Sequence, residues 1–229
     1  MKRTQAQKGF TLVEIAIVLV IIGLLLGGIL KGQEMITQAK IKNAIADFSG
    51  VSAAYFGYQD RYRSTPGDDA QASRWGTTAQ GVFPGDGDRV LVGTYKEACT
   101  SAVVAASPET CKWWDHLRRS GFVAGAGGLQ PNNAFNGLLG VQTGDGGATP
   151  VAVLVNAAGG FTNIVMCSSN LPDKVAIALD VQMDDGIMST GAVRGQLNVG
   201  LNPDIALTAP AANVYQETGT NLYTLCRTF

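Results

Sequence analysis

The chain has 229 residues, enough for one globular domain with an appendage, and its 17 Lys and Arg nearly balance its 18 Asp and Glu. This balance gives no sign of a nucleic-acid partner bound through a general basic surface. With His116 as the only histidine, one chain cannot build a histidine-based metal cluster, and 29 glycines favour a turn-rich head over a helical bundle.

The N-terminal segment has two parts. Residues 1–9 are short, polar and basic, and residues 10–30 form an apolar run with one charge, Glu14. At 1.5 Å per residue the run spans roughly 30 Å, the thickness of a bilayer's hydrocarbon core. The basic leader predicts a cytoplasmic N-terminus, with the rest of the chain outside the inner membrane. No small-residue cleavage site follows the run, which argues against an ordinary secretory signal peptide. A plain signal anchor is an alternative, but it leaves Gly9 and Glu14 unexplained.

The string KGFTLVEIAIVLVIIG, which begins at Lys8, resembles the class III signal of type IV prepilins and type II secretion pseudopilins. The resemblance implies that a membrane peptidase cleaves after Gly9 and methylates the new amino terminus at Phe10. Because cleavage precedes the apolar run, the run stays on the mature protein. It then serves first as a membrane anchor and later as the core of a filament.

Glu14 is a charge inside this run. A carboxylate in hydrocarbon costs on the order of a few kcal/mol unless it finds a partner. In one local explanation, Glu14 lies near the interface and reaches water. In another, Glu14 pairs with the amine of Phe10, four residues earlier on the helix. The resemblance implies instead a pair with the amino terminus of an adjacent subunit, which would set the axial register of each incoming subunit.

Three glycines, Gly23, Gly27 and Gly28, interrupt the apolar run. Many filament-forming pilins carry a proline eight residues after the position of Gly23, whereas this chain has Lys31 there and its first proline is Pro66. The glycines either weaken the helix, at about 1 kcal/mol each relative to Ala, or permit close helix packing. The missing proline weakens the assignment to a major pilin and leaves room for a minor pilin or a pseudopilin.

Residues 31–65 are expected to continue the helix as an amphipathic segment that ends before Pro66. Its apolar positions recur at spacings of three and four: Ile41, Ala44, Ile45, Phe48, Val51, Tyr55, Tyr58 and Tyr62. A helix from Phe10 to Tyr62 would be roughly 80 Å long. It is too long for one small domain, so neighbouring copies are expected to bury its first half.

Residues 66–229 are expected to form an extracytoplasmic head. The predicted fold class is α+β, with the long N-terminal helix packed on an antiparallel sheet in a pilin-like arrangement. Alternating β-branched and apolar residues predict strands at 150–156, 162–167, 192–199 and 221–226.

Two shorter helices are predicted within the head. The first has Pro108 at its first helical position and stops at Gly121, and the second runs from 172 to about 185 with Ser169 or Asn170 as its cap. The expected buried line of the second helix is Val175, Leu179 and Met183. Three segments of the head are similar to heads of a broad group of pilin-like proteins: RYRSTPGDDAQASRW, WWDHLRRSGFVAG and ALDVQMDDGIMSTGAVRG.

The four cysteines indicate disulfides, because the head is expected outside the cytoplasm. Three connectivities are possible. We prefer Cys99–Cys111, which closes a short loop, with Cys167–Cys226, which ties the final strand to the sheet, as pilins commonly fasten their C-terminal region. Each bond is expected to contribute about 2–4 kcal/mol.

No group of residues predicts catalysis, and we assign no metal and no cofactor. Asp115 adjoins His116, but adjacent helical residues point roughly 100° apart and cannot form a base and its orienter, so a packed histidine is predicted. Acidic turn sequences suggest calcium, with Asp86 and Asp88 as the first candidates. None fits the twelve-residue calcium loop, and Asp-Gly is common in turns.

The sequence therefore predicts a structural filament subunit that is not an enzyme. The resemblance implies these partners: prepilin peptidase, further copies of the chain or a mixed filament, the membrane before assembly, an assembly ATPase and an inner-membrane platform protein. The expected location is the inner membrane for the precursor, then a type IV pilus at the cell surface. A periplasmic pseudopilin of a type II secretion system is one alternative, and a monomeric membrane-anchored adhesin or binding protein is another.

Overall fold

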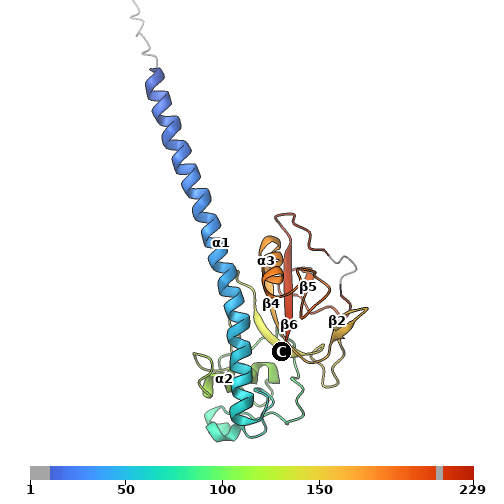
Figure 1. Ribbon diagram of the computed structural model, residues 1–229. Helices are drawn as coiled ribbons and strands as arrows, with labels where there is room; N and C mark the ends of the chain where they lie inside the picture. Colours follow the sequence, from blue (N-terminus) through green and yellow to red (C-terminus); the bar gives the residue numbers. More distant parts are fainter. Residues whose placement is uncertain (1–10, 210–213) are drawn as a thin grey trace, which may run out of the picture. The chain divides into compact units, whose positions relative to one another are not determined.

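The computed structural model describes residues 11–209 and 214–229 (Figure 1). The contacts divide the chain after Lys40, and the two units are described separately. The elements, in chain order, are α1 (Leu12–Tyr62), two short 3₁₀ helices (Ala72–Trp75 and Thr78–Gln80), α2 (Glu109–Arg119), β1 (Leu139–Thr143), β2 (Val153–Asn156), β3 (Gly159–Phe161), β4 (Ile164–Pro172), α3 (Asp173–Met183), β5 (Val193–Leu197) and β6 (Leu222–Thr228).

In the N-terminal unit, α1 begins at Leu12 and continues without a break through Lys40. Its most apolar 18-residue window has a mean hydropathy of 2.8, and none of that window is buried. By length and composition, the helix is long and apolar enough to cross a membrane.

The second part of α1 belongs to the head and is amphipathic, as the sequence predicted. Its buried positions fall on one stripe at helical spacing: Ile41, Ala44, Phe48, Val51, Ala54, Tyr55 and Tyr58. The helix ends at Tyr62 because Arg63 adopts a left-handed backbone conformation, with φ of 55°. Pro66 then prevents the helix from resuming.

A four-stranded antiparallel sheet, in the order β1-β4-β6-β5, forms the centre of the head. Side chains alternate between its two faces. Ile164 and Met166 of β4 pack in a cluster with α1 and α2, whereas Val165 and Cys167 pack on the other face with Tyr95 and the β2–β3 hairpin. Both faces of β4 are therefore buried, and the head has helices on one side of the sheet and the hairpin with loops on the other.

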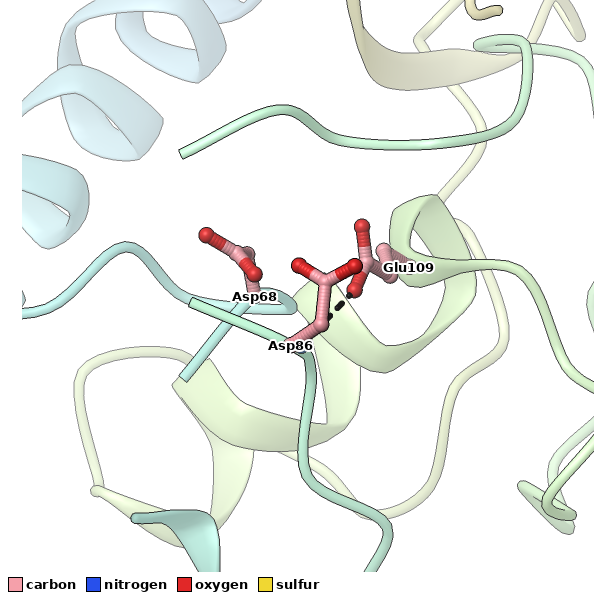
Figure 2. Close-up of side chains that lie close together, drawn as sticks. All are labelled: Asp68, Asp86 and Glu109. Atoms are coloured by element: carbon pink, nitrogen blue, oxygen red, sulfur yellow. Dashed lines mark hydrogen bonds between the residues drawn. The ribbon is translucent and has the colours of Figure 1, made fainter. Parts of the chain in front are cut away.

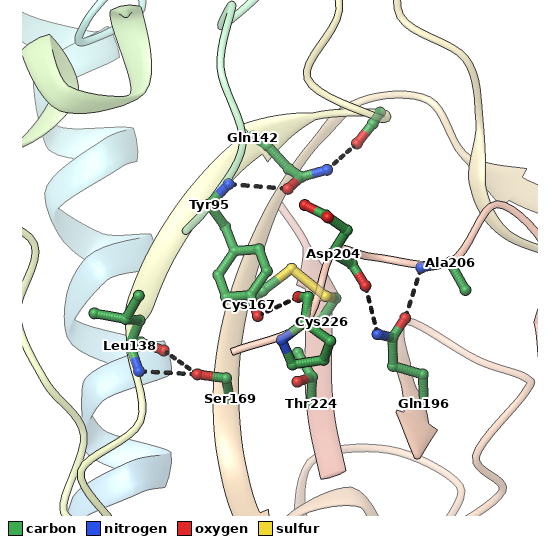
Figure 3. Close-up of a disulfide and its surroundings, with 12 residues drawn as sticks. Tyr95, Leu138, Gln142, Cys167, Ser169, Gln196, Asp204, Ala206, Thr224 and Cys226 are labelled. Carbon is green, nitrogen blue, oxygen red and sulfur yellow. Dashed lines mark hydrogen bonds between the residues drawn. A yellow bond between two sulfur atoms is a disulfide. The ribbon is translucent and has the colours of Figure 1, made fainter. Parts of the chain in front are cut away.

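Loop segments cover both edges of this sheet. At β1, the backbone N–H of Tyr95 donates to Gln142 Oε1 over 2.9 Å, and a Cβ added at Gly140 would lie 2.0 Å from the Tyr95 carbonyl oxygen. At β5, Gln196 donates to the carbonyl oxygen of Asp204 and accepts from the N–H of Ala206 (Figure 3). These bonds are made by glutamine side chains of the two edge strands, and they hold loop backbone beside each edge.

The α+β class and the antiparallel sheet are confirmed, with differences in the details. The predicted strand at 150–156 lies in the separate β2–β3 hairpin, and β1 and β3 were not predicted. Both unpredicted strands contain glycine, which lowers the strand signal. The first short helix begins at Glu109, with Pro108 as its N-cap.

The predicted caps of the second short helix were wrong. Ser169 and Asn170 lie in β4, at an irregularity in its pairing with β6 between Ser168 and Leu171. Asn170 has φ of 55°, a conformation that asparagine tolerates and that suits a bulge. The strand thus continues to Pro172, which caps α3. Val175 and Leu179 are buried as expected, and Met183 is partly buried.

Candidate functional site

The exposed surface of α1 is the most unusual feature of the N-terminal unit. Every Val, Leu and Ile from Leu12 to Leu30 is exposed, by between 46% and 87%. Leaving one such side chain in water costs roughly 1.5–3 kcal/mol relative to burial. This surface therefore requires an apolar environment outside the single chain, such as lipid or other apolar helices.

Glu14 lies in the first turn of this helix, where it forms a capping box with Thr11. The backbone N–H and the hydroxyl of Thr11 both donate to Glu14 Oε2 over 2.8 Å, and the N–H of Glu14 faces Thr11 Oγ1 at 3.3 Å. These reciprocal bonds satisfy donors that a helix N-terminus leaves free. The bonds formed among the described residues use Oε2, so Oε1 remains available for another donor.

The capping box was missed in the sequence analysis, although its signal is present. Thr11 and Glu14 have the T-x-x-E spacing that precedes many helices. This local role is an alternative to the intersubunit role of Glu14, and the two have different requirements. A cap needs a hydrogen-bond acceptor, whereas attraction to an amine needs a charge. The predicted processing junction, Gly9 and Phe10, lies outside the described residues.

The three glycines of the apolar run lie within unbroken helix. A Cβ added at Gly23, Gly27 or Gly28 would have no neighbour within 4 Å. No contact among the described residues therefore requires glycine at these positions. Their small size becomes useful only if another helix packs there, as in small-residue helix interfaces.

Two disulfides stabilise the head, Cys99–Cys111 and Cys167–Cys226. The first joins a loop to α2. The second joins directly opposed residues of β4 and β6, beside the buried ring of Tyr95 (Figure 3). The first disulfide therefore fastens the loop to the helix that packs on the sheet, and the second fastens the chain's C-terminal strand to β4.

His116 is a packed structural residue, as predicted. It is fully buried, its Nδ1 accepts a hydrogen bond from the N–H of Gly67 over 2.9 Å, and its Nε2 lies 3.1 Å from the carbonyl oxygen of Phe83. Burial lowers the pKa of His116 to about 4, so the ring is neutral at pH 7. Both ring nitrogens thus face backbone groups, and Asp115 pairs instead with Arg119 over 2.6 Å.

Two groups of three carboxylates lie close together in the described part of the head. Figure 2 shows Asp68, Asp86 and Glu109, and the second group is Asp180, Asp184 and Asp185. In the first group, Asp68 accepts from the N–H groups of Gly87 and Arg89, at 2.5 and 2.6 Å. Burial raises the pKa of both Asp68 and Glu109.

These bonds give the acidic residues a structural role in turns. Glu109 accepts from the N–H groups of Asp86 and Val92, and so links α2 to the loop before it. Asp88, the other calcium candidate, accepts from the N–H of Val90 over 2.7 Å in a local turn. We assign no cation to either group.

The long N-terminal apolar helix, followed by an antiparallel sheet with shorter helices, is a pilin-like architecture. Residues 4–30 match the family model of the prokaryotic N-terminal methylation motif, which is the class III signal of type IV pilins and pseudopilins. A comparison with curated proteins finds no match. The motif supports a type IV pilin- or pseudopilin-like precursor, and it implies processing by a prepilin peptidase and assembly into a filament.

Proposed function

We propose that the chain is a structural subunit of a type IV pilus or a related filament, polymerised through the apolar part of α1. The observation that carries this proposal is the exposed apolar surface from Leu12 to Leu30, directly after the cleavage and methylation motif. A membrane covers this surface before assembly, and the helices of neighbouring subunits cover it afterwards. The protein acts by association and performs no catalysis.

Processing prepares the surface for assembly. Prepilin peptidase cleaves between Gly9 and Phe10, removes the basic leader, and methylates the amine of Phe10. The positive amine is then the first group of the apolar segment. An assembly ATPase in the cytoplasm and a platform protein in the inner membrane drive the subunit out of the membrane and into the filament.

Glu14 guides the incoming subunit in this proposal. Its carboxylate loses most of its hydration among apolar helices, so a cation there gains strongly from pairing with it. The amine of Phe10 on a neighbouring subunit is such a cation. Because Thr11 holds Oε2 in place, the carboxylate is already oriented when the amine approaches.

Two substitutions separate the cap from the charge. Glu14→Gln keeps an acceptor for Thr11 but removes the charge, and Thr11→Val keeps the charge but removes the hydroxyl. We expect Glu14→Gln to reduce assembled filament at least tenfold, which corresponds to about 1.4 kcal/mol. Thr11→Val should assemble within about twofold of wild type, because it keeps the charge. Sheared or periplasmic filaments are quantified against membrane-bound subunit.

Processing is measured in the same samples. Intact mass identifies methylated Phe10 as the first residue of every variant, so a loss of filaments is not a loss of cleavage. If Glu14→Gln assembles like wild type while Thr11→Val fails, Glu14 acts as a helix cap. A mature N-terminus beyond residue 30 contradicts the proposal as a whole.

A type II secretion pseudopilin is the second candidate, and the absence of a proline near Lys31 leaves room for it. The helix continues through Gly28 and Lys31 without the proline that many filament-forming pilins have, and Lys31 forms an exposed 2.8 Å ion pair with Glu34 one turn later. Immunogold labelling separates the two functions, because a pilin labels long surface fibres and a pseudopilin labels short periplasmic ones. A monomeric adhesin labels neither.

A further inference from the structure

An open cleft of about 930 Å³ lies in the head, and filament assembly through α1 does not use it. Its walls come from the end of α1, the loop that follows, the loop before Leu91, and the adjoining ends of β1 and β4, with Phe229 at one side. All of these segments belong to the unit that begins at Ile41. The volume is at the upper end of the range of roughly 300–1,000 Å³ that is typical of ligand sites.

Two arginines supply the accessible charge of the cleft. Arg63 and Arg89 are both exposed lining residues, and both have left-handed backbones, with φ of 55° and 70°. Such a conformation is uncommon for a residue with a side chain; at Arg63 it ends α1, and at Arg89 the backbone N–H donates to Asp68. Arg63 has only a 3.6 Å contact with the exposed Asp60, and no carboxylate of the described residues lies within ion-pair distance of Arg89.

The two carboxylates of the lining, Asp68 and Asp69, are buried and already hydrogen-bonded. Asp68 accepts from two backbone N–H groups, as described above. Asp69 accepts from the Tyr58 hydroxyl over 2.6 Å and from the guanidinium of Arg74 over 2.5 Å. The exposed charged groups of the lining are therefore the guanidinium groups of Arg63 and Arg89.

The rest of the lining is rich in neutral hydrogen-bonding groups. Gln59, Ser64, Thr162 and Asn163 present amides and hydroxyls, each of which both donates and accepts. This composition suits a ligand with many hydroxyl groups and does not suit a lipid chain. A long polyanion is disfavoured too, because the whole chain carries a net charge of −1.

We propose that this cleft binds a short acidic saccharide. The sugar hydroxyls bond to the amide and hydroxyl side chains, and a carboxylate or sulfate group of the sugar bonds to Arg89 and Arg63. Guanidinium groups suit both anions because they present paired donors. Arg89 contributes more than Arg63, since Arg63 shares its charge with Asp60.

The experiment uses the full chain in detergent micelles and measures binding by isothermal titration calorimetry. The probes are a uronic acid tetrasaccharide, a sulfated tetrasaccharide, a neutral glucose tetrasaccharide and a single-stranded oligonucleotide. We expect at least one of the acidic tetrasaccharides to bind at least tenfold more tightly than the neutral one, and the preferred one identifies the anion. Binding is expected to weaken as salt is raised. Equal binding of the neutral sugar, tighter binding of the oligonucleotide, or no binding of either acidic sugar overturns the proposal.

Three arginine variants locate the site. Arg89→Gln should weaken binding of the preferred acidic sugar at least tenfold, and Arg63→Gln should weaken it severalfold. Arg61→Gln is the matched control, because Arg61 is an exposed arginine in the last turn of α1, two residues before Arg63, and lies outside the cleft lining. An equal loss in the control shows non-specific charge attraction and overturns the assignment. Thermal melting verifies that each variant is folded, and Glu14→Gln should bind like wild type, so this proposal fails or succeeds independently of assembly.

Discussion

Asp180 and His116 are buried titratable groups whose pKa values are shifted in opposite directions. Burial raises the pKa of Asp180 to about 6, and burial lowers that of His116 to about 4. Asp180 Oδ2 accepts from the Tyr215 hydroxyl over 2.6 Å, whereas Oδ1 has no hydrogen-bond partner among the described residues. A buried oxygen without a partner disfavours the charged form of the carboxyl group.

The pH dependence of stability follows from these directions. The contribution of Asp180 is fully present below the unfolded pKa of 3.8 and is lost as the pH rises through about 6. The contribution of neutral His116 is present above 6.5 and is lost as the pH falls through about 4. The effects of these two groups largely offset each other between pH 4 and 6.5.

Asp180→Asn removes one side of this balance. The amide keeps an acceptor for Tyr215, so the variant should be at least as stable as wild type at pH 7. Between pH 7 and pH 4.5 its stability should fall relative to that of wild type by on the order of 1–2 kcal/mol, because only the His116 effect remains. Urea unfolding at pH 7, 5.5 and 4.5 measures this. Asp60→Asn, at an exposed position of α1, is the control, and parallel pH profiles for all three proteins would contradict the prediction.

At the scale of elements, the two disulfides stabilise different parts of the head. Cys167 and Cys226 are fully buried on neighbouring strands and are 59 residues apart in sequence, whereas Cys99 and Cys111 are 12 residues apart. In the chain-entropy model, the longer loop gives the larger stabilisation, by about 1–1.5 kcal/mol. Loss of the buried pair also leaves a gap in a packed cluster.

Replacing both cysteines of a pair by alanine tests this difference. We expect the Cys167→Ala, Cys226→Ala variant to lose about 3–5 kcal/mol of unfolding free energy, and the Cys99→Ala, Cys111→Ala variant about 2–3 kcal/mol. Chemical denaturation under non-reducing conditions gives both values. Peptide mapping of the wild type should recover the same two pairs, and free thiols in protein isolated from the periplasm or cell surface would contradict the assignment.

The elements also show what sequence patterns can predict. The amphipathic stripe of α1 was predictable, because helical spacing and large apolar residues agree over five turns. The strand β1 was not, because Gly140 weakens the pattern and is required only by the Tyr95 backbone, which is distant in sequence. Asn170 was predicted to be a helix cap but lies at a bulge, because asparagine suits both positions.

The same reasoning applies to the sites. The motif around Glu14 is local, so its identity was predictable, and so was the capping box, had the T-x-x-E spacing been considered. The cleft was not predictable. It forms only when the end of α1, the loop around Arg89 and the start of β4 meet, and nothing in any one segment indicates the other two. In the sequence, nothing distinguishes Arg63 and Arg89 from ordinary surface charges.

At the scale of the whole molecule, folding and association are expected to depend on different residues. The three apolar clusters of the head draw on residues from Ile41 onward, and none includes a residue of the described N-terminal part, 11–40. Those residues instead present the exposed apolar surface. The head should therefore fold without them, whereas association of the chain should depend on them.

A fragment of residues 37–229, which keeps one helical turn before Ile41, tests this separation. We expect it to be soluble and monomeric without detergent, with both disulfides formed and cooperative thermal unfolding, because it retains the entire apolar stripe that packs on the sheet. The full chain should need detergent or lipid, since the side chains from Leu12 to Leu30 otherwise associate. Light scattering coupled to size exclusion measures the mass, and circular dichroism follows unfolding. A fragment that oligomerises as the full chain does would place the association surface in the head, and one that lacks a cooperative transition would show that the N-terminal part of α1 is needed for folding as well.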